Sequence, residues 1–302
     1  MNATEVNFFS EGDRIAGLLS LPATPRPAPG VVLAHGYSND KHEFGGFDTA
    51  DDVLTAAGYA VLRFDFRGCG ESAGIPGRML VSTQWPSDLR SAISYLRTRP
   101  EVDPARIGLV GHSMGGGMVT LIASTDPRVR CAVSWAGVSD GERWQREIWT
   151  AHHGEQGWRD FLAQLEADRA RRVLTGNSER RSLAETLAQN AEETAFLDEM
   201  AARFPAYRNE IELESPDNTL AFRPVDALTH CQCPILFIHG TKDLLVLPDH
   251  ALVMHKRAGA QSELTLFEGA GHDLAFGPYQ GEVRSLTLAW LARHLAAAAT
   301  TR

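Results

Sequence analysis

The segment Gly111-His112-Ser113-Met114-Gly115, which two further glycines follow, decides how this 302-residue chain is expected to fold. It lies between an apolar stretch at residues 106–111, typical of a buried strand, and a stretch of helical character at residues 115–124. A serine on such a tight strand–turn–helix bend needs neighbours with almost no side chain two positions away, which Gly111 and Gly115 provide. We therefore predict that Ser113 is lifted out of a sheet and faces the free N–H groups of a helix N-terminus.

Strands and helices alternate on both sides of this bend. Strands are predicted at residues 14–21, 30–35, 59–65, 106–111, 130–135, 234–239 and 262–267, and helices at residues 49–57, 84–99, 115–124, 249–258 and 282–297. Most of the strand stretches are short and continuously apolar, as expected where both faces of a strand are buried. This alternation predicts an α/β fold with a mostly parallel, doubly wound sheet, to which an antiparallel start adds edge strands.

Residues 140–223 interrupt the alternation, because they show helical periodicity at 158–173, 183–189 and 194–204 and no strand signal. Charged residues fill 28 of these 84 positions, yet the segment also carries three of the six tryptophans. We interpret it as a helical cap over a pocket, inserted between late strands of a core formed by residues 1–139 and 224–302. Trp144 and Trp149 are the candidates to bind substrate. The alternatives are a helical excursion without a role in binding, or aromatic side chains that form a small core of their own.

The composition excludes several classes of function. The 29 basic and 38 acidic residues give a formal charge of −9 without a basic run, so we expect no nucleic-acid partner. No stretch approaches about 18 uninterrupted apolar residues. The first residues, MNATEVNFFSEGDR, lack the basic start and the apolar run of a signal peptide. We therefore expect a cytoplasmic protein without a membrane partner.

The cysteine and histidine patterns predict neither a metal site nor a redox site. Cys231-Gln232-Cys233 has a one-residue spacer, unlike the redox C-x-x-C motif or half of a usual zinc knuckle. The chain contains no H-E-x-x-H motif, and the neighbouring His152 and His153 cannot face one ion from a helix. We expect buried or idle thiols and no bound metal.

A serine hydroxyl is a poor nucleophile until a base removes its proton. His272 follows the predicted strand at 262–267 on a glycine-containing loop, and Asp243 follows the strand at 234–239. In folds that carry a serine on such a strand–turn–helix bend, the nucleophile, the acid and the base follow one another along the chain in this order. Asp273 and Asp249 are the alternative acids. Asp273 is adjacent to the histidine in sequence, which places its carboxylate poorly for the ring, and Asp249 is expected to begin a helix after a proline.

Two backbone N–H groups are expected to stabilise the charge that forms on an attacked carbonyl oxygen. The residue after the nucleophile, Met114, provides one. The loop after the strand at 30–35 provides the other, which we assign to Tyr37, because Gly36 lets the backbone turn inward there. We expect the ring of His35 to hold this loop by hydrogen bonds and to do no chemistry itself.

A further string, Asp65-Phe66-Arg67-Gly68-Cys69-Gly70-Glu71-Ser72, also follows a predicted strand. It matches neither G-x-x-x-x-G-K-[ST] nor the G-x-G-x-x-G spacing, so a role in binding nucleotide phosphates is disfavoured. We predict instead that Asp65 and Arg67 form a pair that braces a turn beside the rim of the active site.

These motifs resemble the α/β-hydrolase superfamily over essentially the whole chain. The matching strings are HGY at 35–37, DFRGCGES at 65–72, GHSMGG at 111–116, HGTKD at 239–243 and GAGH at 269–272. Within the superfamily the chain is most similar to the dienelactone-hydrolase-like and feruloyl (cinnamoyl) esterase-like branch, and to the catalytic domain of serine peptidases of the prolyl oligopeptidase type. The resemblance implies a serine nucleophile, a histidine that is first base and then acid, an orienting aspartate and a two-amide oxyanion hole. These roles fall on Ser113, His272, Asp243, Tyr37 and Met114.

The resemblance also narrows the reaction. Dienelactone hydrolases proper have a cysteine nucleophile, and haloalkane dehalogenases and epoxide hydrolases of this fold have an aspartate. The serine at 113 therefore disfavours those three activities. Oligopeptidases carry a large N-terminal propeller, for which this chain has no room.

We therefore expect a serine hydrolase that cleaves small apolar or aromatic carboxylic esters through an acyl-enzyme. It is expected to need no cofactor and to act on a small-molecule ester, and a homodimer is left open as its assembly. The alternatives among enzymes are a small peptidase or amidase with the same triad, a thioesterase and a cofactor-free perhydrolase. The alternative from another class is a ligand-binding receptor that keeps the scaffold without turnover.

Overall fold

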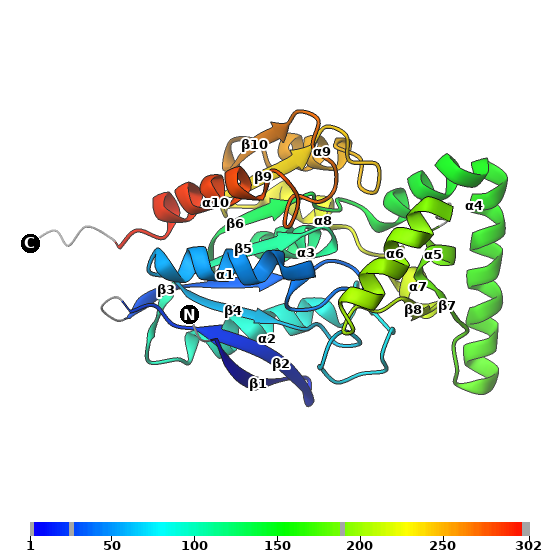
Figure 1. Ribbon diagram of the computed structural model, residues 1–302, viewed down its shortest axis with the longest axis horizontal. Coiled ribbons are helices and arrows are strands. Elements are labelled where there is room, and N and C mark those ends of the chain that lie inside the picture. Colours follow the sequence, from blue (N-terminus) through cyan, green and yellow to red (C-terminus); the bar gives the residue numbers. More distant parts are fainter. Residues whose placement is uncertain (1–2, 24–26, 188–190, 298–302) are drawn as a thin grey trace, which may run out of the picture.

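An eight-stranded sheet lies at the centre of the computed structural model, which describes residues 3–23, 27–187 and 191–297 (Figure 1). Across the sheet its strands are β1 (Thr4–Ser10), β2 (Asp13–Ser20), β4 (Ala60–Phe64), β3 (Ala28–Ala34), β5 (Val102–His112), β6 (Val129–Trp135), β9 (Ile235–Gly240) and β10 (Ser262–Phe267). β1 with β2, and β2 with β4, are antiparallel pairs, whereas all neighbours from β4 to β10 are parallel. The carboxyl ends of six parallel strands therefore meet at one edge.

Helices cover both faces of this sheet, because its central strands are apolar on both. α1 (Gly46–Ala56) and α10 (Gln280–His294) pack against one face. The other face is covered by α2 (Trp85–Arg97), α3 (Met114–Thr125) and α9 (Asp249–Ala258), with the short α8 (Pro224–Ala227) beside α3. In β3, Val31 and Leu33 belong to the core on the α1 and α10 side of the sheet. Val32 and Ala34 belong to the core on the α2, α3 and α9 side. This alternation explains why the strand has no polar face in the sequence.

The predicted doubly wound, mostly parallel α/β fold is confirmed. Each of the seven predicted strands and five predicted core helices has a counterpart within a few residues of its expected bounds. One difference is that β5 begins at Val102, before the predicted start at residue 106. Val102 pairs with Ala28 ahead of a register shift in β3, so the strand is longer than its apolar part.

Residues 140–223 are here called the inserted segment, and their described part (140–187 and 191–223) lies beside the carboxyl edge of the sheet (Figure 1). They contain α4 (Gly141–Thr175), β7 (Arg180–Ser182), α5 (Leu183–Thr186), α6 (Ala191–Arg203), β8 (Glu210–Glu212) and α7 (Glu214–Thr219). Within α4, Gly154 has a positive φ of 65°, and this non-helical residue divides the helix into two parts. Among the residues that the structure describes, no helix is long and apolar enough to cross a membrane.

Two predictions for the inserted segment are wrong in detail. The segment contains strands, because β7 and β8 pair as a small antiparallel sheet. They are only three residues long and are rich in arginine and glutamate, so they carry no apolar alternation that a sequence pattern could reveal. The first helix begins at Gly141 rather than at residue 158. The helix predicted at 183–189 corresponds to α5 at its start, and residues 188 and 189 lie outside the described residues.

Candidate active site

Ser113 lies on the bend between β5 and α3. Its backbone has a φ of 56° and a ψ of −121°, a positive φ that residues other than glycine rarely adopt. A Cβ on Gly111 would lie 2.2 Å from the carbonyl oxygen of Gly115, and a Cβ on Gly115 would lie 2.0 Å from that of Ala34. The Ser113 N–H donates to the carbonyl oxygen of Trp135 at 2.8 Å, which ties the bend to β6. The bend therefore depends on glycine at both positions.

The structure brings Ser113, Asp243 and His272 together at the carboxyl edge. His272 Nε2 lies 3.0 Å from Ser113 Oγ, and His272 Nδ1 lies 2.7 Å from Asp243 Oδ2. Because a carboxylate only accepts, His272 donates from Nδ1 and keeps Nε2 free to accept from the serine hydroxyl. Asp243 follows β9 and His272 follows β10, its parallel neighbour, so both loops leave the sheet at the same edge. The arrangement can activate a hydroxyl group as a nucleophile.

Asp243 is buried, with 1% of its surface exposed, and carries several hydrogen bonds. Its Oδ1 accepts from the N–H groups of Leu245 and Val246 at 3.0 and 2.8 Å. Burial alone would raise the pKa of this carboxyl group, but His272 and His239 hold the pKa well below its usual range. His239 Nε2 lies 3.2 Å from Asp243 Oδ2. Sequence reasoning missed this neighbour, although it begins the HGTKD string.

The two alternative acids have other surroundings. Asp249 begins α9, and its carboxylate lies 3.7 Å from the Arg143 guanidinium. The carboxylate of Asp273 lies against Gly277, where an added Cβ would meet Asp273 Oδ2 at 1.9 Å. His272 Nδ1 directs its hydrogen bond to Asp243, so neither alternative occupies that position.

The loop after β3 passes close to the serine. A Cβ on Gly36 would lie 3.2 Å from Ser113 Cβ. His35 Nε2 accepts from the Phe66 N–H at 3.0 Å, so its Nδ1–H donates to the Gly36 carbonyl oxygen at 2.8 Å. This carbonyl belongs to the same planar peptide unit as the Tyr37 N–H, so holding one fixes the direction of the other. The His35 ring thus orients the first candidate oxyanion donor.

Met114, the second candidate donor, is the first residue of α3 and directly follows Ser113. A backbone N–H at this position has no acceptor within its own helix and lies at the positive end of the helix dipole. The two candidate donors therefore lie on the chain immediately around the serine and on the loop that contacts it.

Asp65 and Arg67 each pair with a different residue, so the predicted Asp65–Arg67 pair is wrong. Lys41 Nζ lies 2.8 Å from Asp65 Oδ2, and Arg67 Nε lies 2.7 Å from Asp88 Oδ1. The chain after the strand folds back onto Asp65, because the Glu71 N–H donates to Asp65 Oδ2 at 2.9 Å. Gly70 permits this approach, since its Cβ would lie 2.2 Å from the Asp65 carboxyl carbon.

The two tryptophans predicted to bind substrate have different neighbours. Trp144 donates from Nε1 to the carbonyl oxygen of Leu245 at 2.9 Å and meets the Tyr37 ring edge-on, with 5.8 Å between ring centroids. Trp149 stacks on Phe161 at 4.3 Å, against a small core of the inserted segment. Trp144 therefore contacts both loops that flank the triad, whereas Trp149 packs within the inserted segment.

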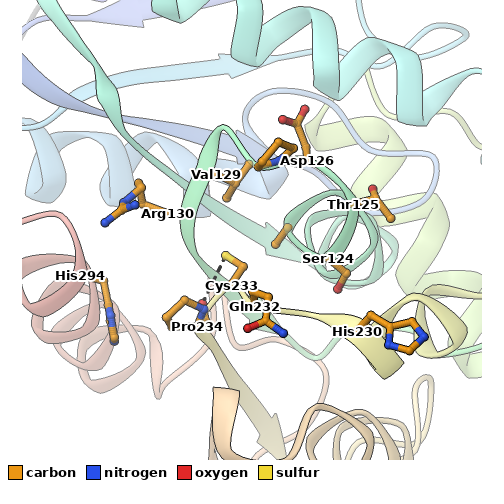
Figure 2. A pocket seen from close by; sticks show the side chains of 12 residues that line it. Ser124, Thr125, Asp126, Val129, Arg130, His230, Gln232, Cys233, Pro234 and His294 are labelled. Carbon is orange, nitrogen blue, oxygen red and sulfur yellow. Dashed lines mark hydrogen bonds between the residues drawn. The ribbon is translucent and has the colours of Figure 1, made fainter.

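The depression shown in Figure 2 lies at the opposite edge of the sheet. It has a volume of about 480 Å³ and is lined by the end of α3 and the starts of β6 and β9, with Asp126, Arg130 and Cys233 among its residues. Parallel strands begin at one edge and end at the other, so this depression is separate from the triad. The four cysteines are buried and free. No group of three or more histidine, cysteine, aspartate or glutamate side chains could hold a metal ion in the described ranges.

Relatives of this chain carry several different descriptions, among them an uncharacterized protein and a thiohydrolase. An uncharacterized 31.7 kDa protein of the traX-finO intergenic region of Escherichia coli is 28% identical over 290 residues, which cover 95% of this chain and 98% of that protein. The thiohydrolase aneE of Aspergillus aculeatus is 35% identical over 132 residues, which cover 43% of this chain and 40% of that protein.

Solved structures share the fold over nearly the whole chain. The α/β hydrolase GrgF from Penicillium sp. sh18 has a TM-score of 0.80 at 20% identity, covering 98% of this chain and 100% of that one. A Pyrococcus furiosus esterase has a TM-score of 0.66 at 18% identity, covering 98% of this chain and 92% of that one. Residues 25–278 match the family model described as serine aminopeptidase, S33. The chain therefore belongs to this α/β-hydrolase family.

Proposed function

We propose that this chain is a serine hydrolase that cleaves carboxylic esters through an acyl-enzyme. Ser113 attacks the ester carbonyl while His272 takes its proton, and Asp243 holds the imidazole in the accepting tautomer and stabilises the imidazolium. The N–H groups of Tyr37 and Met114 stabilise the oxyanion. His272 then protonates the leaving alcohol and later activates the water that releases the acid.

The contact of His272 with both of its partners carries this proposal. Its ring nitrogens lie 3.0 Å from Ser113 Oγ and 2.7 Å from Asp243 Oδ2, within hydrogen-bond reach on both sides. The aspartate is buried, where a charge acts more strongly on its neighbour than it would in water. Membership of the α/β-hydrolase family supports hydrolysis as the reaction but does not identify the substrate.

Labelling with a fluorophosphonate tests the nucleophile. We expect the wild type to be labelled on one serine, and Ser113→Ala to abolish both labelling and ester turnover. Ser124→Ala is the matched control, because it changes a serine of the following helix that donates to the Thr120 carbonyl oxygen. A folded wild type that is neither labelled nor active on any ester would instead favour the ligand-binding receptor.

Amide hydrolysis is the second candidate, because the matching family is described as a serine aminopeptidase. An amine is a poorer leaving group than an alcohol and depends more on protonation by His272. Turnover of p-nitrophenyl esters, aminoacyl-p-nitroanilides and acyl thioesters should be compared on one preparation. The thioester is included because two relatives are named thiohydrolases. We expect the ester to have the highest kcat/KM, and faster anilide turnover would assign an amidase.

We further propose that residues 140–223 act as a cap over the substrate, on a core formed by residues 1–139 and 224–302. Two contacts support this role, since Trp144 meets the Tyr37 ring and the Tyr207 ring lies 5.1 Å from that of Phe44. Both partners belong to the loop after β3, beside the proposed oxyanion donor. Aromatic side chains on this side favour an apolar or aromatic ester.

A further inference from the structure

A second carboxylate–histidine pair, Glu43 and His112, lies beside the triad. Both side chains are buried, each with 2% of its surface exposed. His112 ends β5 directly before Ser113, and Glu43 begins the short 3₁₀ helix η1 (Glu43–Gly45) on the way from β3 to α1. The mechanism proposed above uses neither of them.

Glu43 holds the loop of the candidate oxyanion donor. Its Oε2 accepts from the Gly36 N–H at 2.6 Å, and its Oε1 accepts from Asn39 Nδ2 at 2.8 Å. Oε1 also lies 3.1 Å from His112 Nδ1. Both oxygens already accept N–H bonds, so the carboxyl group is ionised and His112 Nδ1 is the donor. The backbone is strained here, because Glu43 and Phe44 have positive φ values of 46° and 53°.

His112 holds the loop of the proposed base. Its Nε2 lies 2.9 Å from the carbonyl oxygen of His272. A carbonyl oxygen only accepts, so Nε2 carries a proton as well as Nδ1, and a ring that donates from both nitrogens is an imidazolium. Burial alone would lower the pKa of His112, but Glu43, the His272 carbonyl oxygen and Asp243 together raise the pKa above its ordinary value.

We infer that Glu43 and His112 are positioning residues, a buried carboxylate–imidazolium pair that fastens the proposed oxyanion loop to the loop of the proposed base. The inference rests on the proposed function, since it assigns the pair to the same site. One ionic unit contacts the Gly36 N–H on one side and the His272 carbonyl oxygen on the other. The spacing between oxyanion donor and base therefore depends on this pair.

The pair also acts on the charge of the site. The ring centroids of His112 and His272 are 4.9 Å apart. The other titratable groups that face the pair are His35 directly after β3 and Tyr207, which face Glu43, and Asp243 after β9, which faces His112. The His112 cation and the Glu43 carboxylate therefore both contribute to the electrostatic potential at the site.

The charge state of His112 is the first measurement, and it needs no activity. We expect ¹⁵N NMR of the wild type to show both ring nitrogens protonated at about pH 8, where an unperturbed histidine is neutral. Glu43→Gln should remove this signal. A neutral His112 at that pH overturns the inference, whatever the enzyme hydrolyses. Failure of Ser113 to react with a fluorophosphonate would instead overturn the proposed function and leave the NMR result standing.

A double-mutant cycle is the second measurement. We expect Glu43→Gln and His112→Gln each to lower kcat about 10- to 100-fold with little change in KM, because they displace donor and base rather than substrate. The double variant should lose little more than the worse single variant, since the two residues act as one unit. Losses that multiply independently would contradict the coupling.

His250→Gln is the matched control. His250 is as buried as His112 and is also paired with a carboxylate, since its Nε2 lies 2.9 Å from Glu147 Oε2. Its Nδ1 accepts from the Ser139 N–H at 3.0 Å. We expect its kcat to remain within about two-fold of the wild type. If His250→Gln lowered kcat as much as His112→Gln does, the loss in His112→Gln would reflect general damage to the fold and the inference would fail.

The pH profile separates positioning from loss of structure. His112→Gln leaves a negative charge beside the site, because the Glu43 carboxylate loses the cation that balances it. The acidic limb of kcat/KM should therefore move to higher pH by about half a unit or more. Glu43→Gln should not move it in that direction. An acidic limb that stays in place in His112→Gln would overturn the inference.

Discussion

The Asp243 carboxylate at the carboxyl edge of the sheet and the Arg169–Asp217 ion pair of the inserted segment lie in different surroundings. At the edge, the buried Asp243 carboxylate is surrounded by fixed donors. In the inserted segment, the guanidinium groups of Arg169 and Arg172 both bind Asp217 near the surface. Buried charges are costly to leave without a partner, whereas exposed pairs contribute little each. Substitutions at the edge should therefore change the reaction rate by orders of magnitude, and those in the inserted segment should change stability or substrate preference modestly.

The largest expected effect tests the edge directly. Asp243→Asn should lower kcat for a p-nitrophenyl ester by about 10⁴-fold, because an amide donor at this position favours the wrong tautomer of His272. Circular dichroism and the melting temperature should show that the variant still folds. Asp273→Asn is the control and should stay within about two-fold of the wild type. If Asp273→Asn were the damaging change, the assignment of the acid would be wrong.

The second prediction concerns the backbone on which the edge is built. Gly115→Ala should lower the free energy of unfolding by about 3 kcal/mol or more, because its Cβ would lie 2.0 Å from a carbonyl oxygen of β3. Gly281→Ala is the matched control, since a Cβ there meets nothing within 4 Å and the residue lies in α10. That change should be neutral or stabilise by up to about 1 kcal/mol. Equal urea midpoints for the two variants would refute the packing argument.

A third, smaller effect is the pH dependence of stability. The native pKa values of Asp243 and Glu43 are lowered, so the stabilisation from these carboxylates is present above their unfolded pKa values, about 4. It is lost as the pH falls through the native values. The urea midpoint of the wild type should therefore fall between about pH 5 and pH 3. In Asp243→Asn the urea midpoint should fall less over this pH range. An equal fall in the variant would show that Asp243 does not contribute to the pH dependence of stability.

The smallest effect compares two tryptophans of the inserted segment. Trp144→Leu should raise KM for an aromatic ester by up to about ten-fold, because it removes a ring that meets Tyr37. Trp149→Leu should change KM by less than about two-fold and lower the melting temperature instead, since its ring stacks on Phe161. A larger change of KM in Trp149→Leu would show that this ring reaches the substrate.

Chain order and strand ends were sufficient to predict most of the edge. In a parallel sheet, loops that follow neighbouring strands must meet at one edge, so the positions of Asp243 and His272 after two predicted strands bring them together. The glycines around Ser113 could be identified from their spacing two positions on either side of the serine. The structure gives the reason, because the contacts of Gly111 and Gly115 leave no room for a side chain. These are local constraints, which a sequence displays directly.

The Glu43–His112 pair could not be predicted in this way. Glu43 reaches its position through a positive φ, and a glutamate gives no sign of such a backbone in the sequence. Its partner is distant along the chain, and a histidine before a nucleophilic serine has no feature that identifies its role. The strands β7 and β8 escaped prediction for a related reason, since pairing with a distant strand rather than apolar alternation defines them.

The kink at Gly154 divides α4 into an inner and an outer helical part. The helix before it carries Trp144, which is bound to the Leu245 carbonyl oxygen of the core, and the helix after it carries Phe161. The stacked rings of Trp149 and Phe161 bridge the two parts. A Cβ at Gly154 would meet nothing within 4 Å, so no packing at the glycine itself sets the angle. The tilt of the outer helix therefore depends on that ring stack and on the ion pairs of Arg169 and Arg172 with Asp217 of α7. Weakening the stack would remove the aromatic contact between the two helical parts and leave the ion pairs to α7 in place.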